Sequence, residues 1–152
     1  MKRFIRCCAA TAICLMASMV WAGTDWSEDM DKALETAKKD GKYLLVDFSG
    51  SDWCGWCIKL EDEVFSKRPF KEFAKKNLVT VLVDFPKKKK LSTKQSEKNQ
   101  ALATIHDVQG YPTVLLMDSE GKVIGRTGYQ PGGPEAYVKM LQGMIAGKPD
   151  AK

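Results

Sequence analysis

The sequence predicts one α/β domain, with a mixed central β-sheet and helices packed against both of its faces. The chain has 152 residues, enough for a single domain with a hydrophobic core. Two apolar runs, residues 43–48 and 78–83, are separated by a helical pattern, and strands joined in this way pair in parallel through a crossover. Two further runs flank a turn at residues 118–121 and predict an antiparallel hairpin. Helices that alternate with such strands cover both sides of the sheet.

The first 22 residues differ from the rest of the chain. Residues 1–6, MKRFIR, are basic, residues 7–20 are largely apolar, and Ala22 provides a small residue before a cleavage point. This is the layout of a secretory signal peptide, and its apolar part is shorter than the ~20 residues of a membrane span. We therefore expect residues 1–22 to be a cleaved signal peptide and residues 23–152 to be a periplasmic or secreted domain. An uncleaved N-terminal anchor is the alternative.

Loss of this leader changes the charge and the cysteine content. The net charge falls from +5 to +2, because Lys2, Arg3 and Arg6 are removed, so the basic balance gives no reason to expect a nucleic-acid partner. Of five cysteines only Cys54 and Cys57 remain. Two cysteines cannot build the disulfide framework of a small secreted domain, and a bridge between these two closes too short a loop to stabilise the fold much.

The first half of the domain predicts a helix, a strand and a broken second helix. The first helix is expected to begin at Asp25 and to end at Gly41. The strand at residues 43–48 follows it, then a turn at residues 49–52 and a helix from residue 54 onwards. Pro69 should interrupt this helix, and Ser66 is the expected cap of the piece that continues.

The second half begins with the strand at residues 78–83 and a run of four lysines at residues 87–90. Like charges repel one another and stay hydrated, which predicts a solvated loop; a docking patch for an acidic partner is the second interpretation. A helix is expected next, over residues 95–106, with Ala101, Leu102 and Ile105 facing inward.

The hairpin strands are expected at residues 114–117 and 122–126, and a last helix should begin at Pro134.

The spacing of the two cysteines predicts thiol chemistry. Cys54 stands where a helix begins, and the free N–H groups and positive dipole end found there favour a thiolate and lower its pKa. Cys57, three positions on, lies on the same helical face within reach of the first sulfur. An exposed nucleophile with a shielded partner is what thiol–disulfide exchange requires. Gly55 leaves room for a substrate chain, and Trp53 and Trp56 add apolar surface.

Zinc is the main alternative, because Cys-x-x-Cys is also half of a tetrahedral metal site. A closed zinc site needs four ligands, and beyond the leader the chain has no further cysteine and a single histidine, His106. We therefore expect no metal, and we expect His106 to be a surface residue of its helix.

Two segments together resemble the thioredoxin superfamily. They are residues 42–57, KYLLVDFSGSDWCGWC, and residues 110–113, Gly-Tyr-Pro-Thr, and the resemblance extends over residues 25–146. Within that superfamily the chain is most similar to exported, thioredoxin-like thiol–disulfide oxidoreductases. The resemblance implies a thioredoxin-like fold, with Cys54 as the attacking cysteine and Cys57 as the resolving one.

The same resemblance implies roles for four further residues. Asp47 matches the buried acid that assists proton transfer at the second thiol, and Pro112 matches a cis-proline that faces the disulfide. Tyr111 would present its backbone to an extended substrate, and Trp53 matches the aromatic residue before the first cysteine. An acid in an apolar strand should itself have a raised pKa. The alternative for Asp47 is a strand-end carboxylate satisfied by nearby N–H groups.

Three features depart from ordinary thioredoxin. The turn between Asp47 and Cys54 is one residue longer, the dipeptide between the cysteines is Gly-Trp, and the second strand lacks a lysine that could pair with the acid.

These observations lead us to expect an enzyme, a monomeric thiol–disulfide oxidoreductase that acts on protein disulfides in the cell envelope and leans towards reduction. It would need no cofactor besides the Cys54–Cys57 pair, and a membrane-bound thiol donor would supply its electrons. The alternatives are the oxidase or isomerase direction of the same chemistry, or a non-catalytic thioredoxin-like domain that binds polypeptides.

Overall fold

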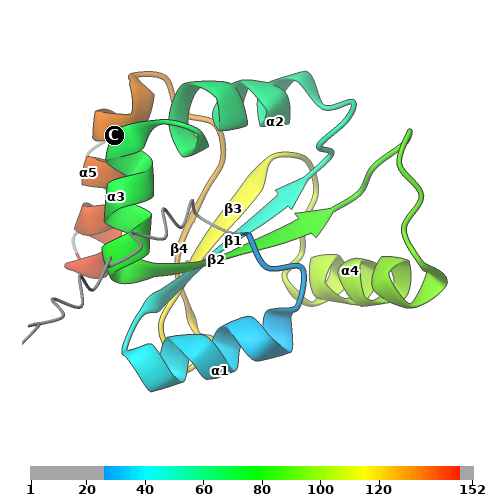
Figure 1. The fold of residues 1–152 in the computed structure, drawn as a ribbon, viewed down its shortest axis with the longest axis horizontal. Helices are drawn as coiled ribbons and strands as arrows, with labels where there is room; N and C mark the ends of the chain where they lie inside the picture. The colour runs from blue at the N-terminus through cyan, green and yellow to red at the C-terminus, as the bar shows by residue number, and fades with distance from the viewer. Residues whose placement is uncertain (1–25, 148–152) are drawn as a thin grey trace, which may run out of the picture.

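A four-stranded mixed sheet forms the centre of the computed structural model, which describes residues 26–147 (Figure 1). The strand order is β2-β1-β3-β4. The strands are β1 (Tyr43–Ser49), β2 (Leu78–Asp84), β3 (Thr113–Met117) and β4 (Val123–Thr127). Strand β1 pairs in parallel with β2 and antiparallel with β3, and β3 pairs antiparallel with β4. The predicted parallel crossover, the hairpin and the mixed sheet are confirmed.

Helices cover the sheet on both faces, as predicted. They are α1 (Met30–Asp40), α2 (Gly55–Leu60), α3 (Arg68–Asn77), α4 (Thr93–Ile105) and α5 (Gly133–Ile145), with a π-helical turn η1 (Glu61–Phe65) between α2 and α3. Helices α1 and α4 lie below the sheet in Figure 1, and α2, α3 and α5 lie above and to its left. The expected signal peptide, residues 1–22, and Asp25 fall outside the described residues.

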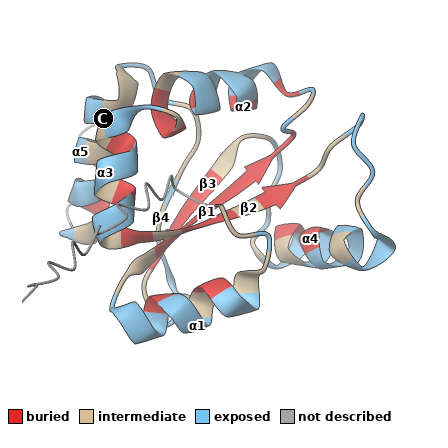
Figure 2. Ribbon diagram, in the orientation of Figure 1, coloured by how far each residue is buried: buried red, intermediate tan, exposed pale blue. Residues whose placement is uncertain are grey.

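The core consists of two layers, one on each face of the sheet (Figure 2). Successive side chains of a strand point to opposite faces, so β1 contributes to both layers. Leu45 packs with the residues of α2, η1, α3 and α5, whereas Leu44, Val46 and Phe48 pack with those of α1 and α4. A strand buried on both faces reads as a continuous apolar run, as β1 does. By the same alternation, Asp47 faces the α2 side.

The start of α1 differs from the prediction. Asp29, not Asp25, caps α1, and its carboxylate accepts a hydrogen bond from the Lys32 N–H at 3.2 Å. The residues before Asp29 are extended: the Ser27 N–H donates to the Thr80 carbonyl, and the Ser27 carbonyl accepts from the Leu82 N–H, both at 2.9 Å. The expected helix start at Asp25 is wrong because this segment pairs with the outer edge of β2 instead.

The cap predicted for α3 is also wrong. Ser66 ends η1, where its N–H donates to the Glu61 carbonyl at 2.9 Å and its hydroxyl donates back to the Asp62 carbonyl at 3.1 Å. Lys67 is the extended residue before α3, and Pro69 stands in the first turn. Pro69 does separate the two helical pieces, because a proline is tolerated only where its missing N–H would have had no partner.

Helix α4 begins at Thr93, two residues before the predicted start, and Ser92 caps it through the Gln95 N–H. Its buried residues are Asn99 and Ala103, and Leu102 packs at the edge of the core. Ala101 and Ile105 are exposed, so the prediction that they face inward is wrong.

The orientation of α4 is set by a polar contact rather than by apolar spacing. The Asn99 amide donates to the Asp84 carbonyl at 2.7 Å and satisfies the last carbonyl of β2. Because an unsatisfied buried carbonyl is costly, this bond favours the orientation in which Asn99 faces the sheet, and Ile105 is exposed in that orientation.

Two glycines should respond in opposite ways to alanine substitution. A Cβ on Gly128 would stand 2.9 Å from the Pro112 carbonyl oxygen, whereas a Cβ on Gly143, inside α5, would meet nothing within 4 Å. We expect Gly128→Ala to lower the free energy of unfolding by about 1–3 kcal/mol through crowding. Gly143→Ala should raise it by about 0.5–1 kcal/mol, because alanine favours the helix. Urea unfolding measures both, and changes of the same sign would contradict the packing described here.

Candidate active site

The two cysteines form a disulfide at the start of α2. Cys54 is the N-cap of that helix and Cys57 lies in its first turn, with Cα atoms 5.2 Å apart. The Cys57 N–H donates to the Cys54 sulfur at 3.2 Å. A backbone donor aimed at this sulfur gives a stronger, charge-assisted hydrogen bond once the atom is a thiolate. The first turn of α2 is therefore built to favour the ionised form of Cys54 after reduction.

Both cysteines are more buried than the sequence predicts for a nucleophile and its partner. Cys54 is 7% exposed and Cys57 is 4% exposed. The expectation of a freely exposed Cys54 is wrong, because the bonded sulfur atoms shield each other in the oxidised protein. Cys54 nevertheless keeps the larger share of solvent contact. Gly55 beside it is exposed, with open space where a Cβ would stand, so this side of the disulfide can be approached.

Asp47 is buried on the α2 side of β1, with Leu82 and Val114 as its neighbours on the adjacent strands. Its Oδ1 atom has no hydrogen-bond partner among the described residues. Burial raises the pKa of Asp47 to about 7, and repulsion from Glu61 and Asp84 adds to the shift. The alternative of a strand-end carboxylate satisfied by N–H groups is therefore wrong. A carboxyl group with this pKa can gain and lose a proton at neutral pH.

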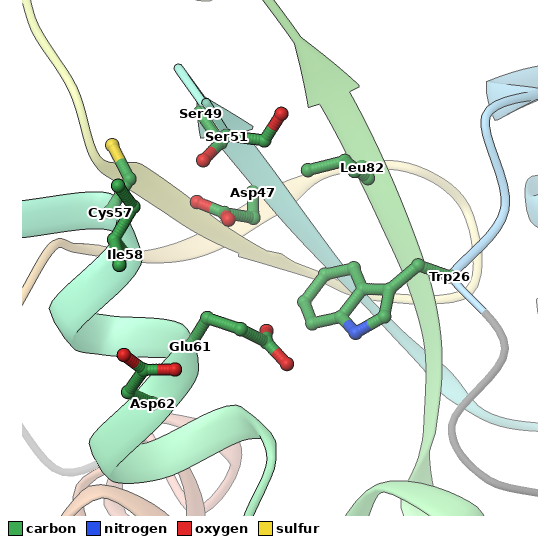
Figure 3. Close-up of a pocket in the computed structure, with 9 residues that line it drawn as sticks. All are labelled: Trp26, Asp47, Ser49, Ser51, Cys57, Ile58, Glu61, Asp62 and Leu82. Carbon is green, nitrogen blue, oxygen red and sulfur yellow. The ribbon is translucent and has the colours of Figure 1, made fainter. Parts of the chain in front are cut away.

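A cavity of about 430 Å³, lined by polar and apolar side chains, joins this acid to the second cysteine (Figure 3). Its lining residues are Trp26, Asp47, Ser49, Ser51, Cys57, Ile58, Glu61, Asp62 and Leu82. In the close-up the Asp47 carboxylate lies between the Cys57 side of α2 and the Trp26 ring. The cavity is large enough for water molecules, and water beside its carboxyl and hydroxyl groups could carry a proton between Cys57 and Asp47. The extra residue in the preceding turn thus leaves Asp47 and Cys57 in one cavity.

Sequence reasoning missed Glu61, which also lines this cavity. Glu61 is an exposed residue, but partial desolvation of its carboxyl group is the main cause that raises its pKa, and its charge in turn raises the pKa of Asp47. The sequence does contain an indication of this position: Glu61 stands four residues after Cys57, and residues with this spacing lie on the same side of a helix.

The lengthened turn before Cys54 is fixed by the end of β2. The Ser51 N–H and hydroxyl donate to the two carboxylate oxygens of Asp84 at 3.0 and 2.7 Å. Asp84 is itself held by Asn99, as described above. The turn therefore has a defined conformation despite its extra residue.

Aromatic side chains surround the cysteine end of this turn. The Tyr111–Pro112 peptide bond is cis, as the resemblance implies. Tyr111 stacks on Phe85 with ring centroids 5.1 Å apart and meets Trp53 edge-on at 6.1 Å. The Trp53 indole N–H donates to the Phe85 carbonyl at 2.7 Å, which fixes the ring beside Cys54. The segment with the cis-proline and the residue before Cys54 thus meet in space, although 58 positions separate Trp53 from Tyr111 in the sequence.

Trp56, between the cysteines, is 58% exposed and packs against Tyr129 at 5.2 Å. The Tyr129 hydroxyl donates to Glu63 at 2.6 Å. Sequence reasoning missed Tyr129, because it follows β4 and reaches the site only through the tertiary fold. Trp53 and Trp56 thus give the site two partly exposed apolar surfaces, one that contacts Tyr111 and one that contacts Tyr129.

Residues 26–147 contain no cluster of three or more histidine, cysteine, aspartate or glutamate side chains placed to hold a metal ion. His106 ends α4, is partly buried, and lies edge-on to Phe48 at 6.1 Å, away from the two cysteines. Over the same residues, each helix is too short or too polar to cross a bilayer.

The chain is similar to thiol–disulfide proteins over most of its length. Residues 30–144 match the family model described as a thioredoxin-like domain. The disulfide bond reductase DsbH of Chlamydia pneumoniae is 41% identical over 124 residues, which are 82% of this chain and 74% of the relative. The thioredoxin-related protein DsbJ of the same organism is 32% identical over 103 residues, 68% of this chain but 30% of that longer protein.

Solved structures give the same result. A structure described as DsbH oxidoreductase superposes with a TM-score of 0.78 and 36% identity, over 91% of this chain and 95% of that one. A thioredoxin from Thermus thermophilus superposes with a TM-score of 0.59 over 79% of this chain and 85% of its own, at 19% identity, a likeness that concerns the fold alone.

Asp47 should make the stability of the oxidised protein depend on pH. Its folded pKa of about 7 lies above the ordinary value of 3.8, so the folded protein binds the proton more tightly than the unfolded chain. Raising the pH from 4 to above 7 therefore costs stability, at most roughly 4 kcal/mol at ~1.4 kcal/mol per pKa unit. We expect Asp47→Asn to stabilise the protein at pH 8 and to have little effect at pH 4, as measured by thermal unfolding.

Asp62→Asn is the matched control, since Asp62 lines the same cavity but is exposed. This variant should keep the pH dependence of the parent. An Asp47→Asn effect of equal size at both pH values would show that the carboxyl group does not titrate as described.

Proposed function

Because this chain belongs to the thioredoxin-like family, we propose that it is a thiol–disulfide oxidoreductase that reduces disulfide bonds in proteins. The proposal depends above all on one observation: the disulfide at the start of α2 shares a cavity with the buried carboxyl group of Asp47, whose pKa is raised to about 7. This pair of features supplies both a nucleophile and a base for the second step.

In the proposed reaction, the Cys54 thiolate of the reduced enzyme attacks one sulfur of a substrate disulfide. The substrate S–S bond breaks, a mixed disulfide with Cys54 forms, and the released substrate thiolate takes a proton from water. The Cys57 thiol then gives its proton to Asp47 through the cavity, and the Cys57 thiolate attacks the Cys54 sulfur. The second substrate sulfur leaves as a thiolate, which takes up the proton held by Asp47 through the cavity, and the Cys54–Cys57 disulfide is formed again. Two electrons pass to the substrate, without a cofactor.

Substrate binding is proposed for the surface around the disulfide. Gly55 offers open space for a polypeptide backbone, and its sequence neighbourhood includes the exposed apolar surfaces of Trp53 and Trp56. By family resemblance, the Tyr111 and Pro112 backbone would align the extended substrate chain, and the contact of Tyr111 with Trp53 supports a place for both in one groove.

Two observations favour the reductase direction over oxidation or isomerisation. The dipeptide Gly55-Trp56 places no cation between the cysteines that would hold the thiolate in a strongly oxidising state. The relative DsbH is itself named a disulfide bond reductase.

Insulin reduction and the reduction potential test this activity. We expect turnover of insulin disulfides with a thiol donor, complete loss of turnover in Cys54→Ser, and accumulation of a mixed disulfide in Cys57→Ser, because the resolving step is then blocked. The Cys54–Cys57 potential, measured against glutathione, should lie near the −270 mV of thioredoxin and far from the about −120 mV of a strong oxidase.

A different outcome would identify a binding module instead of an enzyme. In that case the protein would bind unfolded polypeptides equally well with and without its thiols, and Cys54→Ser would change neither binding nor insulin precipitation.

We further propose that the enzyme is exported by residues 1–22 and is kept reduced by a membrane-bound thiol donor. The basic start and apolar stretch support export, and a reductase in an oxidising compartment needs a supply of electrons. In a Gram-negative host the full chain should yield a shortened, periplasmic protein, and a chain without residues 1–22 should stay in the cytoplasm. Thiol trapping should find Cys54 and Cys57 reduced in the periplasm. Equal reduction in a strain without membrane thiol donors would refute the second part.

A further inference from the structure

Four consecutive lysines, residues 87–90, form an exposed loop fastened beside the disulfide. The Asp52 carboxylate accepts hydrogen bonds from the backbone N–H groups of Lys87, Lys88 and Lys89 at 2.9, 2.7 and 2.9 Å. Asp52 is two residues before Cys54, and two residues of extended chain span at most ~7 Å. The lysine loop, as we call residues 87–90, therefore has a fixed position at the edge of the active site.

The acids near the lysine loop leave it positively charged. Asp52 uses its oxygens on backbone N–H groups, which are the main cause that keeps its pKa low, so it stays ionised and offsets one of the four charges. Glu28 forms an ion pair with Lys89 at 3.7 Å and offsets a second. Lys88 and Lys90 are exposed and take part in no ion pair within residues 26–147.

One cation of the loop reaches the tryptophan next to the attacking cysteine. The Lys87 ammonium lies 3.8 Å from the centre of the Trp53 ring. At the tryptophan between the cysteines, the Lys59 ammonium lies 5.3 Å from the centre of the Trp56 ring, although Glu63 offsets its charge at 3.8 Å. A substrate that contacts Trp53 thus meets a positive surface that continues from Lys87 into the loop.

We infer that the lysine loop recognises acidic polypeptides, so that the enzyme prefers disulfides whose cysteine has aspartate or glutamate within a few residues. The inference rests on the proposed function, since it concerns the substrates of the same cysteines. An extended chain advances ~3.3 Å per residue, so an acid about two to five positions from a substrate cysteine bound at Cys54 reaches the loop. Polypeptide is favoured over an anionic membrane because the charge is placed at the reactive sulfur, where a substrate chain must pass.

The test compares disulfide peptides that differ only in flanking residues, which are acidic, neutral or basic. Lys88→Gln/Lys90→Gln removes two charges from the loop, and Lys75→Gln/Lys76→Gln removes two from the last turn of α3. The second pair is the matched control, because it lies just before β2 begins, whereas the loop follows the other end of that strand.

We expect the parent protein to reduce the acidic peptide roughly tenfold faster than the basic one in kcat/KM at low salt. The loop variant should lose most of that ratio, and the control variant should keep it. The ratio should also shrink at ~0.3 M salt, where charges ~10 Å apart are screened. All three proteins should reduce the neutral peptide equally well, which shows that the variants are folded and active.

A binding measurement separates failure of this inference from failure of the proposed function. An acidic peptide with serine in place of cysteine should shift the NMR amide signals of the loop, and its basic counterpart should not. Reduction of the neutral peptide without an acidic preference would overturn the inference and leave the function intact. Without any turnover the function fails, and the amide shifts alone decide whether the loop binds acidic chains. Loop-dependent binding to phosphatidylglycerol vesicles that the acidic peptide does not compete with would overturn it in favour of a membrane surface.

Discussion

Strand β1 is hydrogen-bonded on both edges and buried on both faces, and the site depends on that constraint. Side chains two positions apart on a strand lie on the same face, so Asp47 must point to the face on which Leu45 packs under α2 and α5. Its carboxyl group must enter the layer that contains Cys57. The same strand delivers the chain to the turn that ends at Cys54, so one element places the acid, the turn and the first sulfur relative to one another.

Burial of this carboxyl group is costly, and the rest of the domain tolerates the cost. Large side chains of α3, η1 and α5 fill the remainder of that layer: Phe65, Phe70, Tyr137 and Leu141 are almost wholly buried. The free energy gained by burying these side chains offsets the cost of placing one carboxyl group in an apolar environment. Burial favours the neutral form of Asp47 and raises its pKa to about 7, which would make the acid available for proton transfer at neutral pH. Such a loss of folding stability in exchange for reactivity is common at active sites.

The sequence predicted most of the fold, because strands β1, β2 and β3 carry strong apolar patterns, the turn at residues 118–121 indicates the hairpin, and Cys54 and Pro134 stand where helices begin. The predictions were wrong where two neighbouring residues were equally good helix caps, and where a polar contact determined which face of a helix is buried. Asp25 and Asp29 are both good caps, and only the pairing of Ser27 with β2 selects Asp29. The buried face of α4 follows the bond of Asn99 to Asp84, which spacing does not show. Glu61 and Tyr129 reach the site through tertiary packing. The three hydrogen bonds that the Asp52 carboxylate accepts from residues 87–89 correspond to no recognisable sequence pattern.

The short bridge that Ser27 makes with β2 covers part of a sheet margin that would otherwise be open. An open strand at the margin of a sheet is a template on which unfolded polypeptides add as a further strand and then aggregate. Here Ser27 occupies the middle of the outer margin of β2, and the opposite margin is the short, five-residue β4. In the proposed reductase, a polypeptide substrate would therefore meet the loops around the two sulfur atoms and not a long open sheet edge that would retain it.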